Sequence, residues 1–230
     1  MKKYEITDIA HPDNPNLHRI RAVTDLTENV LAGMLGGYVE SRDNLDQAGR
    51  AWISADAIAY ENAVVCGDAV LTDHAVAKGN AYVGKNATVM GDATVQDDAI
   101  VCGGLLMGKS CVCGYAVIRQ DEQTLCAPII DGSARVYGEI SGNSCICGSA
   151  ILNSDEQTRC APMIGGNARV YGELTGNVVC QGGAVVLPGV KLYNTTADCF
   201  VLKDDTVSVV PAQRPEVTTS KGTKHHENER

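Results

Sequence analysis

Large aromatic side chains are scarce in this sequence, which has one Trp and one Phe among 230 residues. A core of interlocking large side chains is therefore not expected, and small aliphatic residues must fill the interior. Glycine is abundant, with 24 residues. This combination favours a thin, stacked architecture in which Val, Ile, Leu and Ala form ladders between neighbouring strands.

Basic patches and long apolar runs are also missing. The formal net charge is −9 and the body of the chain has no run of Lys or Arg, so neither nucleic acid nor an anionic membrane surface is expected as a partner. No apolar stretch approaches the length of a membrane span, and the first residues lack the apolar segment of a secretion signal. We expect a cytoplasmic protein whose ten cysteines are reduced.

A period of six residues dominates residues 51–104. Alanine recurs at every sixth position from Ala51 to Ala99, and an aliphatic residue or another alanine follows two positions after each. The unit reads aliphatic-x-x-turn-Ala-x, as in residues 83–88. Asp, Asn or, once, His precedes each alanine after the first. Since Asn and Asp tolerate left-handed backbone, we expect this position to be the left-handed residue of a corner.

An α-helix cannot accommodate this repeat, because a period of six moves successive aliphatic residues around the helix, and glycine, Asn and Asp interrupt every unit. Short strands joined by tight corners can. If three units close one triangular coil, equivalent residues of successive coils stack at a strand spacing of about 4.8 Å. The sequence therefore predicts an all-β fold, a single parallel β-helix of about eight coils.

A longer period replaces the six-residue repeat after Gly104. Two stretches recur 34 positions later, residues 121–128 as 155–162 and residues 134–139 as 168–173. Since 34 is two less than the length of two coils, we favour a two-coil repeat with one shortened corner. The interval of 36 residues between Cys66 and Cys102 agrees with a two-coil recurrence. The alternative is one coil plus a protruding hairpin that carries the Asp-Glu-Gln-Thr stretch.

These patterns divide the chain into four segments. They are an N-terminal cap of strands and turns (1–50), the hexapeptide-repeat β-helix (51–194), a C-terminal cap (195–217) and a polar tail that we expect to be disordered (218–230).

The stretch from Trp52 to Gly104 resembles the hexapeptide-repeat superfamily. The resemblance implies a left-handed β-helix, whereas parallel crossovers are normally right-handed. It also implies a homotrimer with acyltransferase activity that depends on acyl-coenzyme A or acyl-carrier protein. Residues 17–22, 33–41 and 44–45 resemble a narrower group, the enterobacterial YdcK-type proteins, to which acetyltransferase activity is ascribed. The implied reaction moves an acyl group from acetyl-coenzyme A or a similar thioester to a small acceptor, with no tightly bound cofactor.

His74 is the one histidine within the predicted coils. Acyltransferases of this superfamily commonly use a coil histidine as general base, so the resemblance implies this catalytic role for His74. His74 lies directly before Ala75, one place later in the unit than the catalytic histidine of such transferases. Its counterparts in other units are Asp and Asn, so the alternative is a corner residue without a chemical role.

No metal site is expected. The γ-class carbonic anhydrases of the same superfamily need three histidine ligands on zinc. The other histidines of this chain lie in the predicted N-terminal cap (His11 and His18) and in the tail (His225 and His226). A zinc enzyme of this class is therefore a poor match.

Two Cys-x-Cys pairs, Cys111 with Cys113 and Cys145 with Cys147, also need an explanation. The two-coil interpretation places both pairs on the same face. It also separates them by about 10 Å, too far to share one zinc ion. Small, weakly polar thiols suit a tight interior, and we expect these four to be packing residues. We expect the same of Cys126 and Cys160.

Two functions follow from the sequence. The first is the acyltransferase, and the second is a non-catalytic scaffold or binding rod that keeps the fold without the chemistry. His74 in a groove between subunits, beside a slot for pantetheine, would favour the enzyme. His74 in bulk solvent with no other base nearby would favour the rod. The repeated acidic, Arg and Tyr positions of the second half are what duplication of a structural unit produces.

Overall fold

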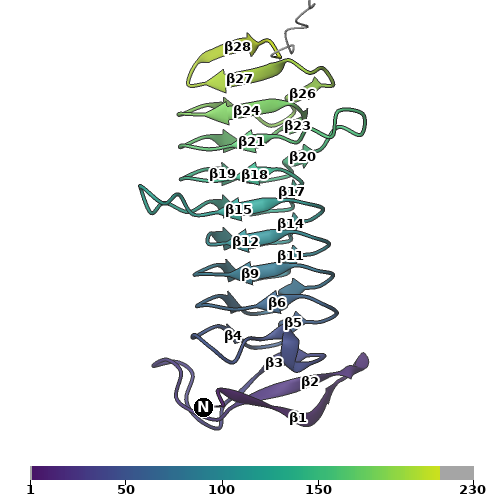
Figure 1. The fold of residues 1–230 in the computed structure, drawn as a ribbon, viewed down its shortest axis with the longest axis vertical. Coiled ribbons are helices and arrows are strands. Elements are labelled where there is room, and N and C mark those ends of the chain that lie inside the picture. The colour runs from purple at the N-terminus through teal and green to yellow at the C-terminus, as the bar shows by residue number, and fades with distance from the viewer. Residues whose placement is uncertain (1, 213–230) are drawn as a thin grey trace, which may run out of the picture.

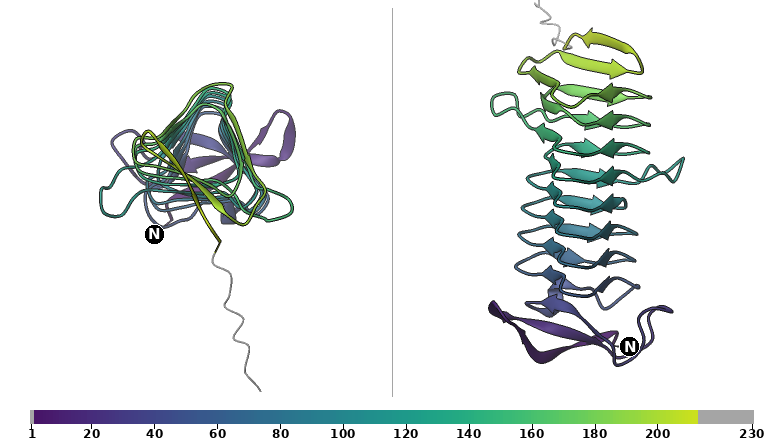
Figure 2. Two further views of the ribbon diagram at one scale, coloured as in Figure 1. Left: turned by 90° about the horizontal axis from the view of Figure 1, so that it is seen from above. Right: turned by 180° about the vertical axis from the view of Figure 1, so that it is seen from behind.

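Residues 2–212, which the computed structural model describes, form one parallel β-solenoid (Figure 1). The view from above shows that each coil is a triangle (Figure 2). The predicted all-β parallel β-helix is therefore confirmed, while its left-handed winding stays a prediction. The segment 218–230, expected to be disordered, lies outside the described residues. Within the described part of the chain, no helix has the length and apolar character needed to cross a membrane.

Three sheets form the faces of the triangular prism, and the chain visits them in turn. The first face contains β3 (Leu35–Val39), β5 (Ile58–Ala59), β8 (Val76–Ala77), β11 (Thr94–Val95), β14 (Cys111–Val112), β17 (Arg135–Val136), β20 (Ile151–Asn153), β23 (Glu173–Gly176) and β26 (Lys191–Asn194). The second face contains β6 (Val64–Val65), β9 (Tyr82–Gly84), β12 (Ile100–Cys102), β15 (Val117–Arg119), β18 (Glu139–Ile140), β21 (Met163–Ile164), β24 (Val178–Gln181) and β27 (Cys199–Lys203). The third face contains β4 (Trp52–Ile53), β7 (Val70–Leu71), β10 (Thr88–Val89), β13 (Leu105–Leu106), β16 (Ile129–Ile130), β19 (Cys145–Ile146), β22 (Arg169–Val170) and β25 (Val185–Val186).

Antiparallel strands cover both ends of the solenoid. At the N-terminal end, β1 (Tyr4–His11) pairs with β2 (Asn14–Ala22), and β2 pairs with β3. The strand β3 then pairs in parallel with β5, so the first turn of the solenoid already begins within the segment assigned to the N-terminal cap. A short 3₁₀ turn, η1 (Arg42–Asn44), completes a corner of that turn. At the other end, β27 and β28 (Thr206–Val210) form a hairpin after about nine turns.

The interior consists of the ladders that the repeat predicts. All nine alanines from Ala51 to Ala99 are fully buried, and so are the nine residues that follow each of them by two positions. Equivalent residues stack directly, as Val65 on Val83 and Val83 on Val101. After Gly104 the spacing changes, yet Ile130 still pairs with Ile146 on the third face. Aliphatic side chains therefore fill the prism along its length, with alanine frequent in the first half and Leu and Ile more frequent in the second.

The corners are four-residue turns with one left-handed residue. At a typical corner the Ala57 amide donates to the Ser54 carbonyl at 3.1 Å, and Ala55 has a φ of +52°. The left-handed position lies two residues before each repeat alanine, and it holds Gly49, Ala55, Glu61, Gly67, Asp73, Gly79, Lys85, Gly91 and Asp97. The prediction that the residue directly before the alanine is left-handed is therefore wrong by one position.

Polar side chains at both corner positions bond neighbouring coils. At the left-handed position, the Glu61 carboxylate accepts a hydrogen bond from the Gly79 amide of the next coil at 2.7 Å. At the following position, Asn62 donates to Asn80 at 3.0 Å, and Asn80 donates to Asp98 at 2.9 Å. The left-handed position holds glycine or alanine in five units and a charged residue in the other four, so polarity alone does not identify it.

The repeat of 34 residues comes from protruding loops. Residues 121–128 and 155–162 contain no strand and leave the solenoid as loops, near β15 and β20 respectively (Figure 1). The interval spans five strands, from β15 to β20, which is one and two-thirds turns including one loop. The two-coil interpretation with a shortened corner is therefore wrong. One loop lies at the corner between the second and third faces, and the other at the corner between the first and second faces.

Candidate functional site

The loop around residues 155–162 is held by an aspartate at its base. Asp155 is buried, with 8% of its surface exposed, and its carboxylate accepts hydrogen bonds from the Thr158 amide at 2.7 Å and hydroxyl at 2.8 Å. These hydrogen bonds lower the pKa of Asp155. Asp121 holds the other loop through Thr124 in the same way. The repeated Asp-Glu-Gln-Thr sequence is thus a loop-closing motif.

Replacing Asp155 by Ala should open this loop. The carboxylate stabilises the loop at pH values above its ordinary pKa of 3.8, and this effect is lost as the pH falls through the lowered folded-state pKa. At pH 8 the unmodified protein has the full stabilisation, and the alanine variant has none of it. We expect trypsin to cleave after Arg159 about tenfold faster or more in this variant. Asp121→Ala is the matched control, because it opens only the other loop. Equal cleavage rates at Arg159 in both variants would show that Asp155 does not hold the loop.

Two cavities flank this loop. The larger, about 790 Å³, lies toward the second face, and the smaller, about 630 Å³, lies toward the first face. Both have volumes typical of small-molecule sites. Tyr137 and the loop residues Ser154, Asp155 and Glu156 line both cavities. The loop therefore divides one concave region of the surface into two pockets.

The larger cavity combines an apolar wall with charged groups. Val117 and Met163 of the second face form part of the wall. Arg159 and Glu156 of the loop bring one charge of each sign. Within residues 2–212, Glu156 makes no side-chain hydrogen bond or ion pair, so it is free to act on a ligand. This cavity was not predicted from the sequence, although the interruption of the hexapeptide period marks the loop that forms one side of it.

Glu139 and Tyr137 form the floor of the larger cavity. The Glu139 carboxylate is ion-paired with Arg119 of the preceding coil. The neighbouring Cys113 thiol raises the pKa of Tyr137 above its ordinary value of 10, so the phenol is a neutral hydrogen-bond donor at neutral pH. The floor thus offers a neutral phenol and an ion-paired carboxylate, while the loop adds the carboxylate of Glu156.

His74 lies away from both cavities. It occupies the corner between the third and first faces, between β7 and β8, whereas the loop lies at the corner between the first and second faces. Its side chain is 71% exposed, and its Nδ1 lies 3.5 Å from an Asp92 carboxylate oxygen of the next coil. This contact would fix the imidazole with Nε2 directed outward. The structure therefore does not bring the predicted catalytic residue to the pockets.

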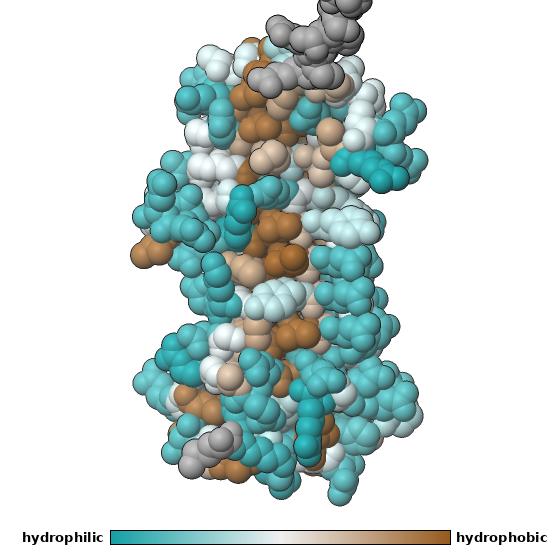
Figure 3. Space-filling view, viewed as in Figure 1, coloured by the Kyte–Doolittle hydropathy of each residue, from teal (hydrophilic) through white to brown (hydrophobic). Residues whose placement is uncertain are grey.

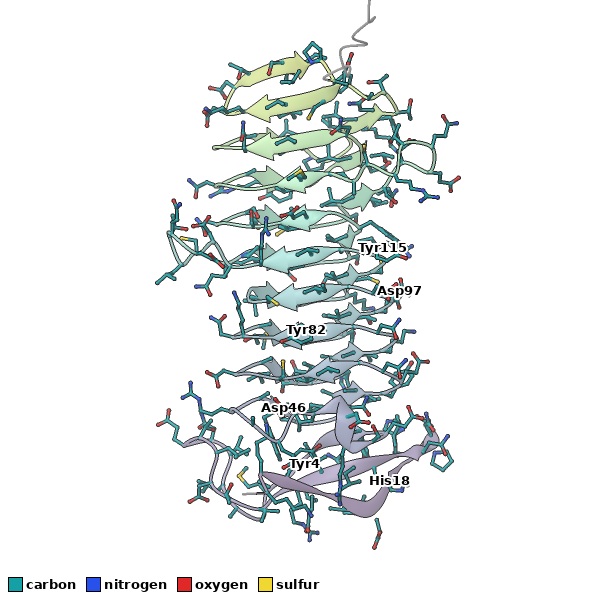
Figure 4. The ribbon with its side chains drawn as sticks, in the orientation of Figure 1. Tyr4, His18, Asp46, Tyr82, Asp97 and Tyr115 are labelled. Atoms are coloured by element: carbon teal, nitrogen blue, oxygen red, sulfur yellow. The ribbon has the colours of Figure 1, made fainter. Side chains whose placement is uncertain are left out.

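An apolar stripe runs along the second face. It consists of the outward residues Val64, Tyr82, Ile100, Val117, Met163, Val179 and Val201. Figure 3 shows a line of brown patches down the middle of the molecule, and Figure 4 labels Tyr82 near the middle of this view and Tyr115 to its right. Glu139 interrupts the stripe beside the larger cavity. An exposed apolar patch of this kind is typical of a contact surface.

The cysteines do not all fill the interior. Cys113 and Cys180 are buried, but the other eight thiols, including Cys126 and Cys160 in the loops, are partly exposed. The prediction that places both Cys-x-Cys pairs on one face is also wrong, because Cys111 lies in β14 of the first face and Cys145 in β19 of the third. Among the described residues, no group of three or more His, Cys, Asp or Glu side chains is arranged to hold a metal ion.

Comparisons with known proteins add no further information about this site. No protein-family model matches the chain, and no curated protein matches it.

Proposed function

We propose that the protein is an acyltransferase of the hexapeptide-repeat type, which moves an acyl group from acetyl-coenzyme A or a similar thioester to a small acceptor. The observation that carries the proposal is the cavity of about 790 Å³ beside loop 155–162, on a β-solenoid of hexapeptide repeats. Its apolar wall suits the thioester arm, and Glu156 and Arg159 suit a polar acceptor.

A homotrimer is part of this proposal. The larger cavity shares Val117 and Met163 with the apolar stripe of the second face, so it opens at the edge of that stripe. A second copy packed on the stripe would cover the open side of the cavity and exclude water from it. The left-handed winding implied by the resemblance is consistent with such an assembly.

The reaction needs a general base. The base removes a proton from the acceptor hydroxyl or amine, the acceptor atom attacks the thioester carbonyl, and the coenzyme A thiolate leaves and takes up a proton. The corner that carries His74 lies opposite the second face, so His74 can serve only if copies pack on another face, where Asp92 would orient the imidazole. Glu156 can serve within the cavity itself.

The rival function is a non-catalytic scaffold or binding rod. The exposure of His74 and its distance from both pockets favour this alternative. It requires no general base, and the apolar stripe would then serve as a contact surface.

Thermal unfolding with acetyl-coenzyme A tests the proposal. A ligand that binds only the folded state stabilises it by about 2.7 kcal/mol at a hundred times its Kd. We therefore expect 1 mM acetyl-coenzyme A to raise the midpoint by several degrees, and coenzyme A thiol release to follow when an acceptor is supplied. No change in the midpoint at this concentration would contradict the acyltransferase and favour the rod.

Two variants then assign the base. Loss of the general base should reduce thiol release by about 100-fold or more while leaving the thermal shift in place. If His74→Ala has this effect and Glu156→Gln does not, the base is His74, and the reverse result assigns Glu156. If neither variant slows thiol release, both assignments are wrong.

A further inference from the structure

The two Cys-x-Cys segments are copies of one arrangement. Cys145 pairs with Arg169 of the next coil, and Cys111 pairs with Arg135 in the same register. The same register places a tyrosine of the next coil beside the second cysteine of each pair, Tyr137 beside Cys113 and Tyr171 beside Cys147. Although the pairs lie on different faces, each dithiol adjoins an Arg-x-Tyr segment.

The thiols of one pair are already in contact. The Sγ atoms of Cys145 and Cys147 are 2.8 Å apart. Both residues are partly exposed, whereas Ile146 between them is fully buried, so both thiols point outward from the coil. Residues two apart in a strand have Cα atoms separated by about 6.6 Å, within the range that a disulfide spans. Bond formation therefore requires only a small local adjustment.

The two thiols of a pair differ in acidity. A hydrogen bond from Cys113, assisted by the charge of Arg135, lowers the pKa of Cys111 to about 7. The hydrogen bond to Cys111 and burial raise the pKa of Cys113. In the other pair, burial and the contact with Cys145 raise the pKa of Cys147 to about 12. Cys111 can thus attack as a thiolate while Cys113 stays protonated, which is the division of roles in reactive dithiols.

We propose that Cys145 with Cys147, and likewise Cys111 with Cys113, are redox-active dithiols that each close to a disulfide on oxidation by a peroxide. The thiolate of Cys145 or Cys111 attacks one peroxide oxygen and becomes a sulfenic acid, while the other oxygen leaves and, after taking up a proton, forms water. The second thiol attacks the sulfenic sulfur, the S–S bond forms, and the hydroxyl group leaves as a second water. Two thiols are oxidised and one peroxide is reduced.

Proteolytic mapping tests this proposal directly. Trypsin releases residues 110–119, which contain only Cys111 and Cys113, and residues 136–159, which contain only Cys145 and Cys147. After brief treatment of the reduced, folded protein with hydrogen peroxide, we expect both peptides to lose two hydrogen atoms and to resist alkylation until dithiothreitol is added. Peptides 120–135 and 160–169, with the single thiols Cys126 and Cys160, serve as internal controls and should still be alkylated.

A charge variant checks the role of the arginines. Arg169→Gln should slow closure of the Cys145 pair by about threefold or more at pH 7, because a nearby cation favours the thiolate. Closure of the Cys111 pair should keep its rate in the same molecules. Failure of either dithiol peptide to close faster than the single-thiol peptides are oxidised contradicts the proposal for that pair. Equal slowing of both pairs by Arg169→Gln would contradict the assigned role of Arg169.

Discussion

Replacing Asn44 by Ala is expected to lower the free energy of unfolding by about 3 to 5 kcal/mol. Asn44 is fully buried at the first corner of the solenoid, in η1. Its Nδ2 donates to the carbonyls of Glu61 and Ala63, both at 2.9 Å, and thereby joins the first turn to the next. Its Oδ1 accepts from the amides of Glu40 and Ser41. Alanine would remove these partners from the Ser41 amide and from the carbonyls of Glu61 and Ala63, and the Ala63 carbonyl is buried, so the unpaired groups are costly.

Asn62→Ala is the matched control for this experiment. Asn62 lies at the equivalent corner one turn later, but its side chain is exposed and bonds only to Asn80. We expect its removal to cost less than about 1 kcal/mol, because water replaces the lost partner. Urea unfolding followed by circular dichroism measures both variants. Similar losses in the two variants would show that Asn44 does not secure the first turn.

The interior of the solenoid could be predicted because it depends on one local rule. A coil must place a small residue at each corner and an aliphatic residue at each strand centre, so a period of six is visible wherever the corners are tight. The ladder from Ala51 to Val101 follows directly from that period. The backbone at the corners could not be predicted to the residue. Glu61 and Asn62 are both polar because both bond the next coil, yet only Glu61 is left-handed.

The prediction for the second half of the solenoid, after Gly104, was wrong for a different reason. An interval of 34 residues does not say which of those residues lie inside the coil, and two coils with a short corner match it nearly as well as five strands with a loop. Because of this ambiguity, Cys145 was predicted on the wrong face, and the pockets beside residues 155–162 were not predicted. The residues that line a pocket come from three successive coils, and their neighbourhood depends on register that the sequence period does not fix here.

Replacing Ile100 by Glu is expected to dissociate the proposed homotrimer. Ile100 is 41% exposed and lies on β12 between Tyr82 and Val117, near the middle of the apolar stripe. In a single chain the new carboxylate would remain in water, so the fold should lose little stability. In a trimer packed on this face, three carboxylates would be buried in one apolar interface, and the desolvation of each is costly. Light scattering after size exclusion should therefore give the mass of one chain for Ile100→Glu.

Thr94→Glu and Thr88→Glu are the controls, because they place the same charge on outward positions of the first and third faces. Both should keep the mass of the unmodified protein. A trimer that persists in Ile100→Glu, or that dissociates only in one of the controls, would rule out the second face as the contact. The dissociated variant also connects assembly to function. If a second copy closes the cavity beside Val117 and Met163, Ile100→Glu should lose the thermal shift with acetyl-coenzyme A although both pocket residues are intact.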